Sequence, residues 1–426
     1  MLERGKSPNT HQINSLHLPE PDKLFLDNGV EVALFKLGSQ NVVHIEFVFK
    51  TSLCNADNLV VPSAATELIG TSSKKYSSGE IAEKIDYYGA FIASNINMDI
   101  LTFSVFSLTK YIDKVLLIFQ DALMNVVYES RDLETHLRNA SQHLKTDLDK
   151  VEYLCSKEFN RQLFEDHPYA KNIEITDFEK IITKDLQNYF NDFIGPNLLN
   201  IVVSGNFELN IFKVLNKCFG NWNGGAINNQ LDKLIYSEPK KVIINRENAF
   251  QSAIRIGKIL DVEFGSEDYF ILKILNTILG GYFGSRLMSN IREDKGFTYG
   301  IKSSIISYNH AIFIVISTEV KAEVTVSALK EIYKEINILK KDLISEKELV
   351  KVKNYISGSL LRMIDGPFLI AEQYKLLNLK GYELKFLLKF YNSIQKVTAD
   401  QLLECANKYL DKKSLSEVVV GKLDNN

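Results

Sequence analysis

The chain has 426 residues, of which 45% are hydrophobic and 24% charged, a composition typical of a globular protein with more than one core. Its net charge of −3 predicts no polyanion-binding surface and so disfavours nucleic acid as a partner. No stretch approaches about 20 uninterrupted apolar residues, and the N-terminus lacks an apolar signal-peptide core. We therefore expect a soluble, cytoplasmic protein without a membrane span.

The first half begins with strands and continues with helices. Asp27-Asn28-Gly29 between two apolar runs predicts a hairpin, since Asn-Gly readily takes the positive φ of a type I′ turn. Ser77 and Glu80 form a capping-box pattern, which predicts a helix that Gly89 ends. The other expected elements are strands at 42–50, 91–96, 101–107 and 200–205, long helices at 110–127 and 131–165, and a helix pair after 168.

The second half repeats this order of elements. Thr398 and Gln401 form the capping box of its last helix, which a final strand follows. The expected strands are 241–246, 252–260, 298–306, 311–317 and 416–421, and the expected helices are 266–281, 285–296, 321–340, 345–376, 380–394 and 397–410.

Matching glycines support an internal duplication. Gly89 and Gly296 follow matching helices 207 residues apart, and Gly205 and Gly421 close matching strands 216 residues apart. We predict an α+β protein of two homologous repeats, each a mostly antiparallel sheet with helices packed on one face. The expected domains are residues 1–222 and 241–426, with a Gly/Asn-rich linker at 223–240.

The segment LGGYFGSRLMSNIREDKGFTYGI (279–301) resembles the C-terminal signature of the M16, or insulinase-like, metallopeptidases, which include the mitochondrial processing peptidase. The Asn-Gly hairpin, the Gly-Thr before SSGEIAEKIDYYGA and the EDHPYA motif at 165–170 agree with it. The resemblance spans nearly the whole chain and implies the duplicated M16 fold.

Active members of this family carry an inverted zinc motif, H-x-x-E-H, in the first repeat. Aligned from Gly70-Thr71, its three positions fall on Val61, Ala64 and Ala65, none of which binds zinc or transfers a proton. A further carboxylate ligand is expected on a later helix, where this chain has Ser141, Gln142 or His143. A hydrolytic zinc needs three protein ligands and an open water position, so we expect no metal in this chain and zinc in a partner subunit.

No other metal or nucleophile motif stands out in the sequence. No histidine pair has metal-ligand spacing, and His136 and His143, which share a helix face, are interpreted as solvated or capping residues. The glycines at 280, 281 and 284 form no phosphate-binding motif and are better explained by close helix–sheet approach. Four widely separated cysteines favour free thiols, with a structural disulfide as the alternative: Cys54, Cys155, Cys218 and Cys405.

Arg292 and Tyr299 match an Arg/Tyr pair found in the bacterial two-subunit branch of the family. There, one subunit provides the zinc motif and the other, zinc-less subunit provides the pair. The resemblance implies that these two residues bind an unfolded peptide and act catalytically in trans, with a partner that has an intact H-x-x-E-H motif. On residue type alone, a surface arginine and a half-buried tyrosine remain the alternative.

Two other functions stay open. The chain could be a structural scaffold like the core proteins of the respiratory bc1 complex, or a homodimer that binds peptides without cutting them. The retained NIREDKGFTYG (290–300) favours the peptidase partner, because a scaffold has no chemical use for the Arg/Tyr pair.

Overall fold

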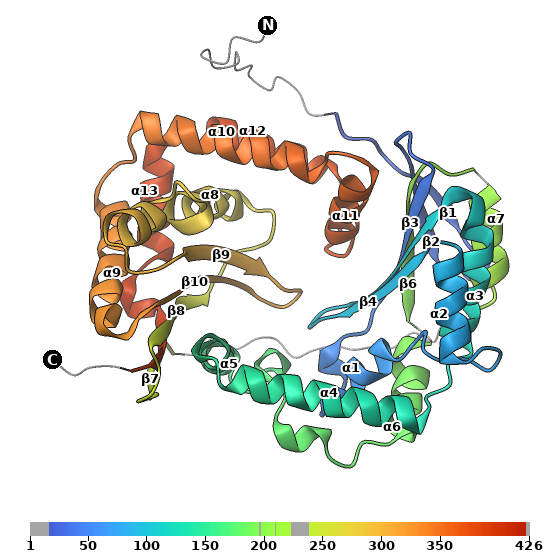
Figure 1. Ribbon diagram of the computed structural model, residues 1–426. Helices are drawn as coiled ribbons and strands as arrows, with labels where there is room; N and C mark the ends of the chain where they lie inside the picture. The colour runs from blue at the N-terminus through green and yellow to red at the C-terminus, as the bar shows by residue number, and fades with distance from the viewer. Residues whose placement is uncertain (1–16, 196, 209, 223–237, 423–426) are drawn as a thin grey trace, which may run out of the picture.

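The computed structural model describes residues 17–195, 197–208, 210–222 and 238–422. It has two sheets, one in each half of the chain, and each sheet has helices of its own half on its outer side (Figure 1). The predicted α+β fold of two repeats is confirmed. Within the described residues, no helix is long and apolar enough to span a membrane.

The first sheet has six strands in the order β1-β2-β6-β3-β5-β4. Only β2 and β6 pair in parallel, and the other neighbours are antiparallel. The strands are β1 Asp22–Phe25, β2 Glu31–Lys36, β3 Val42–Phe49, β4 Phe91–Ile96, β5 Leu101–Leu108 and β6 Leu198–Gly205. The helices of this half are α1 Val60–Glu67, α2 Ser78–Tyr87, α3 Ile112–Met124, α4 Ser130–Leu148, α5 Val151–Phe164, α6 Thr183–Tyr189 and α7 Asn210–Phe219.

The second sheet has five strands in the order β7-β11-β8-β10-β9, and again one pair, β7 with β11, is parallel. The strands are β7 Lys241–Asn245, β8 Gln251–Ile259, β9 Ile301–Ser307, β10 Ile312–Lys321 and β11 Ser416–Gly421. The helices are α8 Glu267–Asn276, α9 Thr325–Lys341, α10 Glu346–Met363, α11 Pro367–Asn378, α12 Lys385–Lys396 and α13 Ala399–Tyr409. Two π-helical segments, Thr277–Gly281 and Met288–Asp294, lie between α8 and β9.

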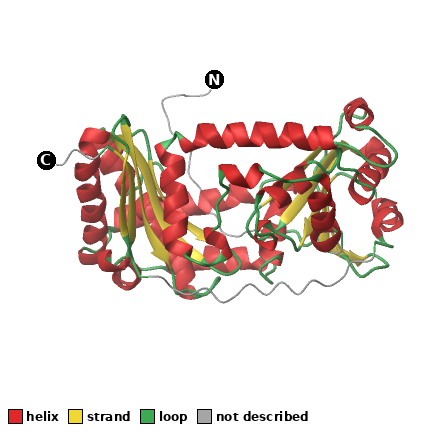
Figure 2. Ribbon diagram, turned by 90° about the horizontal axis from the view of Figure 1, so that it is seen from below, coloured by secondary structure: helices red, strands yellow, loops and turns green. Residues whose placement is uncertain are grey.

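The duplication extends to the register of the helices. α4 begins at Ser130 and α10 at Glu346, 216 residues later, and α5 and α11 begin the same distance apart, at Val151 and Pro367. The long α10 bridges the two halves along one side of the molecule (Figures 1 and 2).

The helices α5 and α11 each pack against the sheet of the other repeat. Phe159 of α5 lies in one buried cluster with Val418 and Val420 of the second sheet, and α5 contacts β8 and β11. Tyr374 of α11 packs edge-on against Phe35 of the first sheet, with ring centroids 5.3 Å apart. The repeats therefore share buried cores, although each helix belongs by sequence to the opposite half.

Two helix predictions were wrong, and the exchange explains the first of them. The helix expected over 131–165 is two helices, because α4 ends at Leu148 and α5 turns away to reach the second sheet. The helix expected over 345–376 also breaks, at Gly366 with φ +92° and Pro367 at the first position of α11. Tertiary packing sets the first break, whereas local Gly-Pro chemistry sets the second.

Local turn and capping predictions were mostly confirmed. Ser77 donates its hydroxyl to Glu80 at 2.7 Å at the start of α2. The 27–29 hairpin forms, but its turn is not type I′, because Asn28 keeps a negative φ and only Gly29 is positive, at +85°. The amide of Asn28 instead donates to the carbonyls of Phe219 and Trp222. Most of the expected linker, 223–237, lies outside the described residues, and the domain limits 1–222 and 241–426 stay a prediction.

Candidate functional site

The helix α1 holds the three positions where an M16 zinc motif would stand. Just before it, the Asn58 side chain accepts from the Val60 N–H at 2.9 Å. Val61 is half-buried, whereas Ala64 and Ala65 are 0% exposed and belong to the core of the first half. At Ala64 and Ala65 this face of α1 is therefore filled by protein.

Tyr128 helps to close this face. Its hydroxyl donates to the carbonyl of Ala65 at 3.0 Å. Burial and, to a smaller extent, the nearby Tyr189 raise the pKa of Tyr128, so the phenol stays neutral. A buried tyrosine thus hydrogen-bonds to the backbone of the helix onto which the zinc motif was aligned.

The later helix, α4, does not complete a metal site. Gln142 and His143 are exposed and Ser141 is half-buried. His136 was expected to be solvated, but its side chain is only 10% exposed and its Nδ1 lies 3.8 Å from Glu67 of α1. Within the described part of the chain, no three His, Cys, Asp or Glu side chains stand close enough together to hold a metal ion.

Arg292 and Tyr299 lie on the segment of the second half that leads into β9. Arg292 stands in the π-helical segment Met288–Asp294, and Tyr299 lies in the following loop, two residues before β9 rather than in the strand as expected. Gly296 turns the chain between them with φ +64°. π-Helical turns are frequent at functional sites.

The two side chains are held differently. The Arg292 guanidinium lies over the ring of Phe283, 4.6 Å from its centroid. Tyr299 is 93% exposed, and no hydrogen bond joins it to Arg292. Thr298 fixes the backbone beside it by donating its hydroxyl to the Glu319 carbonyl at 2.6 Å. The phenol is thus presented to solvent on an anchored loop.

A cavity of about 460 Å³ adjoins this pair. Phe283 and Gly300 line the cavity, whereas Arg292 and Tyr299 do not. The pair therefore stands at the rim of the cavity, and the two side chains do not both project into it. Glu152 of α5 and Arg255 of β8 line it as an ion pair 3.3 Å apart. Partial burial, and then the charge of Glu152, raise the pKa of Glu319 in the same wall.

The neighbouring arginine and glycines have structural roles. Arg286 forms a two-pronged ion pair with Glu348 of α10, at 2.9 and 2.8 Å, which ties the loop to that helix. A Cβ on Gly280 would lie 2.7 Å from the Ser303 nitrogen, so only glycine lets this segment approach β9. The prediction of close helix–sheet approach is confirmed at Gly280.

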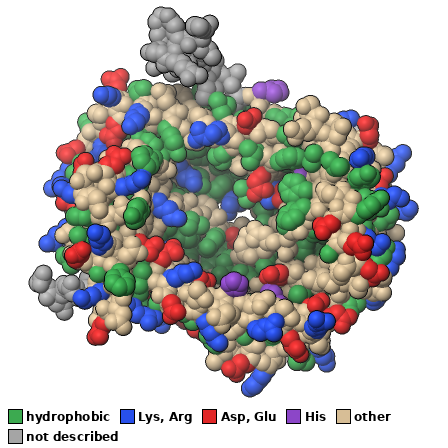
Figure 3. Space-filling model, in the orientation of Figure 1, with side chains coloured by type: hydrophobic (Ala, Val, Ile, Leu, Met, Phe, Trp, Pro, Cys, Tyr) green, Lys and Arg blue, Asp and Glu red, His purple; other side chains and the backbone are tan. Residues whose placement is uncertain are grey.

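The edge strands of both sheets reach toward a central hollow. β4 ends the first sheet and β9 ends the second, and they extend toward each other in Figure 1. Figure 3 shows the hollow in the same orientation. Asp99, beyond the tip of β4, accepts from the Tyr169 hydroxyl at 2.5 Å and from the backbone N–H of Asn309 at 3.0 Å. The second bond joins the β4–β5 hairpin to the β9–β10 hairpin.

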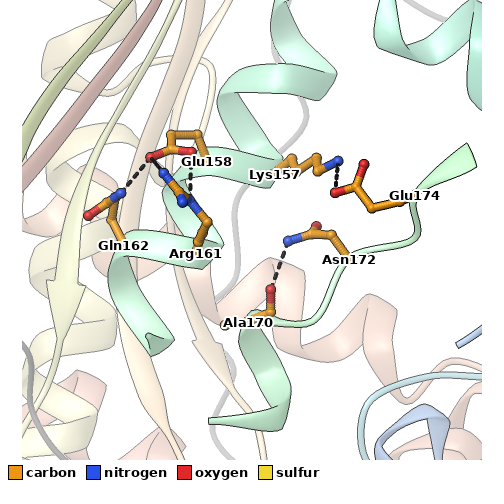
Figure 4. Close-up of polar contacts among 7 residues, drawn as sticks. All are labelled: Lys157, Glu158, Arg161, Gln162, Ala170, Asn172 and Glu174. Carbon is orange, nitrogen blue, oxygen red and sulfur yellow. Dashed lines mark hydrogen bonds and ion pairs between the residues drawn. The ribbon is translucent and has the colours of Figure 1, made fainter. Parts of the chain in front are cut away.

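The helix α5 forms one side of this region and is anchored by polar contacts that the sequence did not reveal (Figure 4). Lys157 pairs with Glu174 at 2.6 Å, and Glu158, which is largely buried, accepts from both Arg161 and Gln162. The i, i+3 and i, i+4 spacings of Glu158, Arg161 and Gln162 are the only sequence signal for this group.

The four thiols are unpaired: Cys54, Cys155, Cys218 and Cys405. Burial raises the pKa of Cys155 and of Cys405 to about 12. Neither thiol is therefore available as a thiolate nucleophile at neutral pH.

The chain is similar to one family profile and to two named bacterial proteins. A family profile described as "Peptidase M16 inactive domain" matches residues 180–356. The Bacillus subtilis (strain 168) protein named "Uncharacterized zinc protease YmxG" is 24% identical over 299 residues, which cover 70% of this chain and 72% of that protein. The "Probable inactive metalloprotease YmfF" of the same organism is also 24% identical over 299 residues, 68% of each chain.

The fold is shared with a solved structure. The crystal structure of a peptidase M16 inactive domain from Pseudomonas fluorescens superposes with a TM-score of 0.87 at 18% identity, covering 95% of this chain and 98% of that one. At this identity the match concerns the fold alone.

Proposed function

The chain belongs to the M16 peptidase family, and from that premise we propose that it is the zinc-less subunit of a heterodimeric zinc metallopeptidase. It would bind an unfolded peptide and complete the active site of a partner that carries an intact H-x-x-E-H motif. The relatives named as zinc protease and as inactive metalloprotease support a pairing of active and inactive chains.

One contrast between the two repeats carries this proposal. The zinc positions Ala64 and Ala65 are buried in a packed core, whereas Tyr299 is 93% exposed beside a cavity and Arg292 is stacked at its rim. A scaffold gains no stability from an exposed phenol. The exposed pair therefore favours a role that needs a second chain.

The chemistry that the pair can supply is specific. Peptide hydrolysis passes through a tetrahedral oxyanion, and the Tyr299 hydroxyl can donate a hydrogen bond to it. The Arg292 guanidinium stays charged at any working pH and presents several fixed donors to peptide carbonyls or a terminal carboxylate. The zinc of the partner subunit would supply the Lewis acid.

The free edge of β4 supports binding of the peptide in an extended form, whereas the carbonyls of Ser303 and Ile305 on the edge of β9 already accept hydrogen bonds from side chains of α8. An edge strand presents unpaired backbone N–H and C=O groups, to which a peptide can add as a further strand. Folded proteins cannot offer such a strand, so the substrates would be unfolded segments.

The proposal is tested by capture of the tagged full-length chain from its native cell, with the co-purifying chains sequenced. The expected result is a similar amount of one chain that contains H-x-x-E-H. Recovery of this chain alone would favour the peptide-binding homodimer or monomer, and recovery with membrane-complex subunits would favour the scaffold.

A further inference from the structure

A second cavity, of about 510 Å³, lies on the opposite side of the second half from the central hollow, between α9 and β7 (Figure 1). Five lysines line it and only two carboxylates do, although the whole chain carries a net charge of −3. We call it the basic groove; its lysines are Lys241, Lys330, Lys334, Lys341 and Lys412.

The positive charge of the groove is only partly neutralised from within, because one of its five lysines pairs with a lining carboxylate. Lys330, Lys341 and Lys412 form no ion pair with any carboxylate of the described residues, and Lys334 pairs only with Glu331, at 3.1 Å. The excess lysines therefore leave a positive field along one wall of the groove.

The floor of the groove is ordered and partly aromatic. The Tyr333 hydroxyl donates to Glu417 at 2.5 Å, and both residues are buried. Lys412 lies over the Tyr333 ring, with its Nζ 4.4 Å from the centroid. Glu417 also lies 3.9 Å from Lys241, so these two charges offset each other and the positive excess comes from the other four lysines.

The groove is bordered by a free strand edge. β7 pairs with β11 on one side, and no strand of the described residues pairs with its other side. Lys241 lines the groove, and Ile243, two residues further along β7 and so on the same face of the sheet, is 61% exposed. An edge of this kind accepts an extended segment by backbone hydrogen bonds.

We propose that the basic groove binds an extended, acidic segment of a partner protein, which adds to β7 and places its carboxylates against the lysines of α9. Charge complementarity and the free strand edge carry this proposal. It does not depend on Arg292, Tyr299 or the zinc of a partner, because the groove lies on a different face of the molecule.

The test measures binding of a fluorescein-labelled peptide with six consecutive glutamates to the full-length chain by anisotropy, at low and at 300 mM salt. The variant Lys330→Glu, Lys334→Glu, Lys341→Glu is compared with Lys114→Glu, Lys145→Glu, Lys213→Glu, which makes the same change of net charge on exposed helix positions of the first half. Circular dichroism checks that both are folded, and a Lys→Gln version of the groove triple is used if the first one is not.

We expect the groove variant to weaken binding at least tenfold and the control by less than twofold, with wild-type affinity falling as salt rises. Equal weakening by both triple variants would mean that the net charge of the whole protein, and not the basic groove, attracts the peptide. That result would overturn the proposed binding site. Absence of binding, or tighter binding of a single-stranded oligonucleotide than of the glutamate peptide, would overturn the acidic-peptide assignment.

Discussion

Ala64 and Ala65 are the residues onto which the acid and one zinc ligand of the H-x-x-E-H motif were aligned from the sequence. Their side chains are fully buried, and Tyr128 hydrogen-bonds to the backbone at Ala65. On this alignment, the space of the expected metal site is packed with protein. Restoring one residue cannot restore the site.

The substitution Ala64→Glu is expected to lower the free energy of unfolding by about 3 kcal/mol, because it overpacks the core and buries an unpaired carboxylate. Urea denaturation measures this, and Gln142→Glu, on exposed α4, is the matched control with a change within about 0.5 kcal/mol. A stable Ala64→Glu variant would show that the face of α1 is open.

His44 is a buried residue of β3. Its ring stacks on Phe106 with centroids 3.8 Å apart, and neither ring nitrogen has a hydrogen-bond partner among the described residues. Burial, and then the charge of Lys375, lower its pKa from 6.5 to about 4. The ring is therefore neutral in the folded protein at neutral pH.

This shift predicts a loss of stability in acid. Below pH 6.5 the unfolded chain binds a proton at His44 that the folded chain takes up only near pH 4, so the stabilisation is complete above pH 6.5 and falls by about 3 kcal/mol by pH 4. His44→Phe, which keeps the stacking, should flatten the pH dependence of the unfolding free energy across this window. The exposed control His143→Gln should leave it unchanged, and an unchanged slope in His44→Phe would contradict the assignment.

The element α11 is attached to the first sheet by a buried charge cluster as well as by apolar contacts. Lys375 lies 2.6 Å from Glu46 of β3 and 2.6 Å from Glu372 of its own helix. Glu46 and Lys375 are both more than nine-tenths buried. Each charge is tolerated there only because its partner is present.

Removing one partner should therefore be costly. Lys375→Met is expected to lower the unfolding free energy by about 3 kcal/mol, because it leaves Glu46 buried without its counter-charge. The double variant Glu46→Gln, Lys375→Met should recover most of this loss in denaturant titrations. A double variant as unstable as the single one would mean that Lys375 acts through packing rather than charge.

At the scale of the whole molecule, the two repeats are joined by reciprocal exchange of α5 and α11. We propose that the expected limits 1–222 and 241–426 mark repeats in the sequence rather than units that fold alone. Without α5, the second half would expose the apolar face formed by Phe313, Val418 and Val420.

The fragment 238–422 alone should therefore lack cooperative unfolding and should bind a dye for exposed apolar surface. Mixing with the fragment 1–222 should restore a sharp transition, as followed by near-ultraviolet circular dichroism. A cooperative transition in 238–422 by itself would contradict a shared core.

Local chemistry made much of this architecture predictable. Period-two patterns identified the strands, capping boxes located helix starts at Ser77 and Thr398, and matching glycines revealed the duplication. The break at Asp149 and the partners of α5 could not be predicted, because they depend on contacts with the distant sheet. For the same reason, sequence placed Arg292 and Tyr299 near each other but showed neither the stacking on Phe283 nor the exposure of the phenol.

The most direct test of the central claim is the rate of peptide hydrolysis by the chain reconstituted with its H-x-x-E-H partner. Tyr299→Phe is expected to lower kcat about 10²–10³-fold with little change in KM, the scale for one lost oxyanion donor. The control Tyr87→Phe, which alters another exposed tyrosine, should keep full activity. Full activity in the Tyr299→Phe pair would contradict a catalytic contribution from Tyr299.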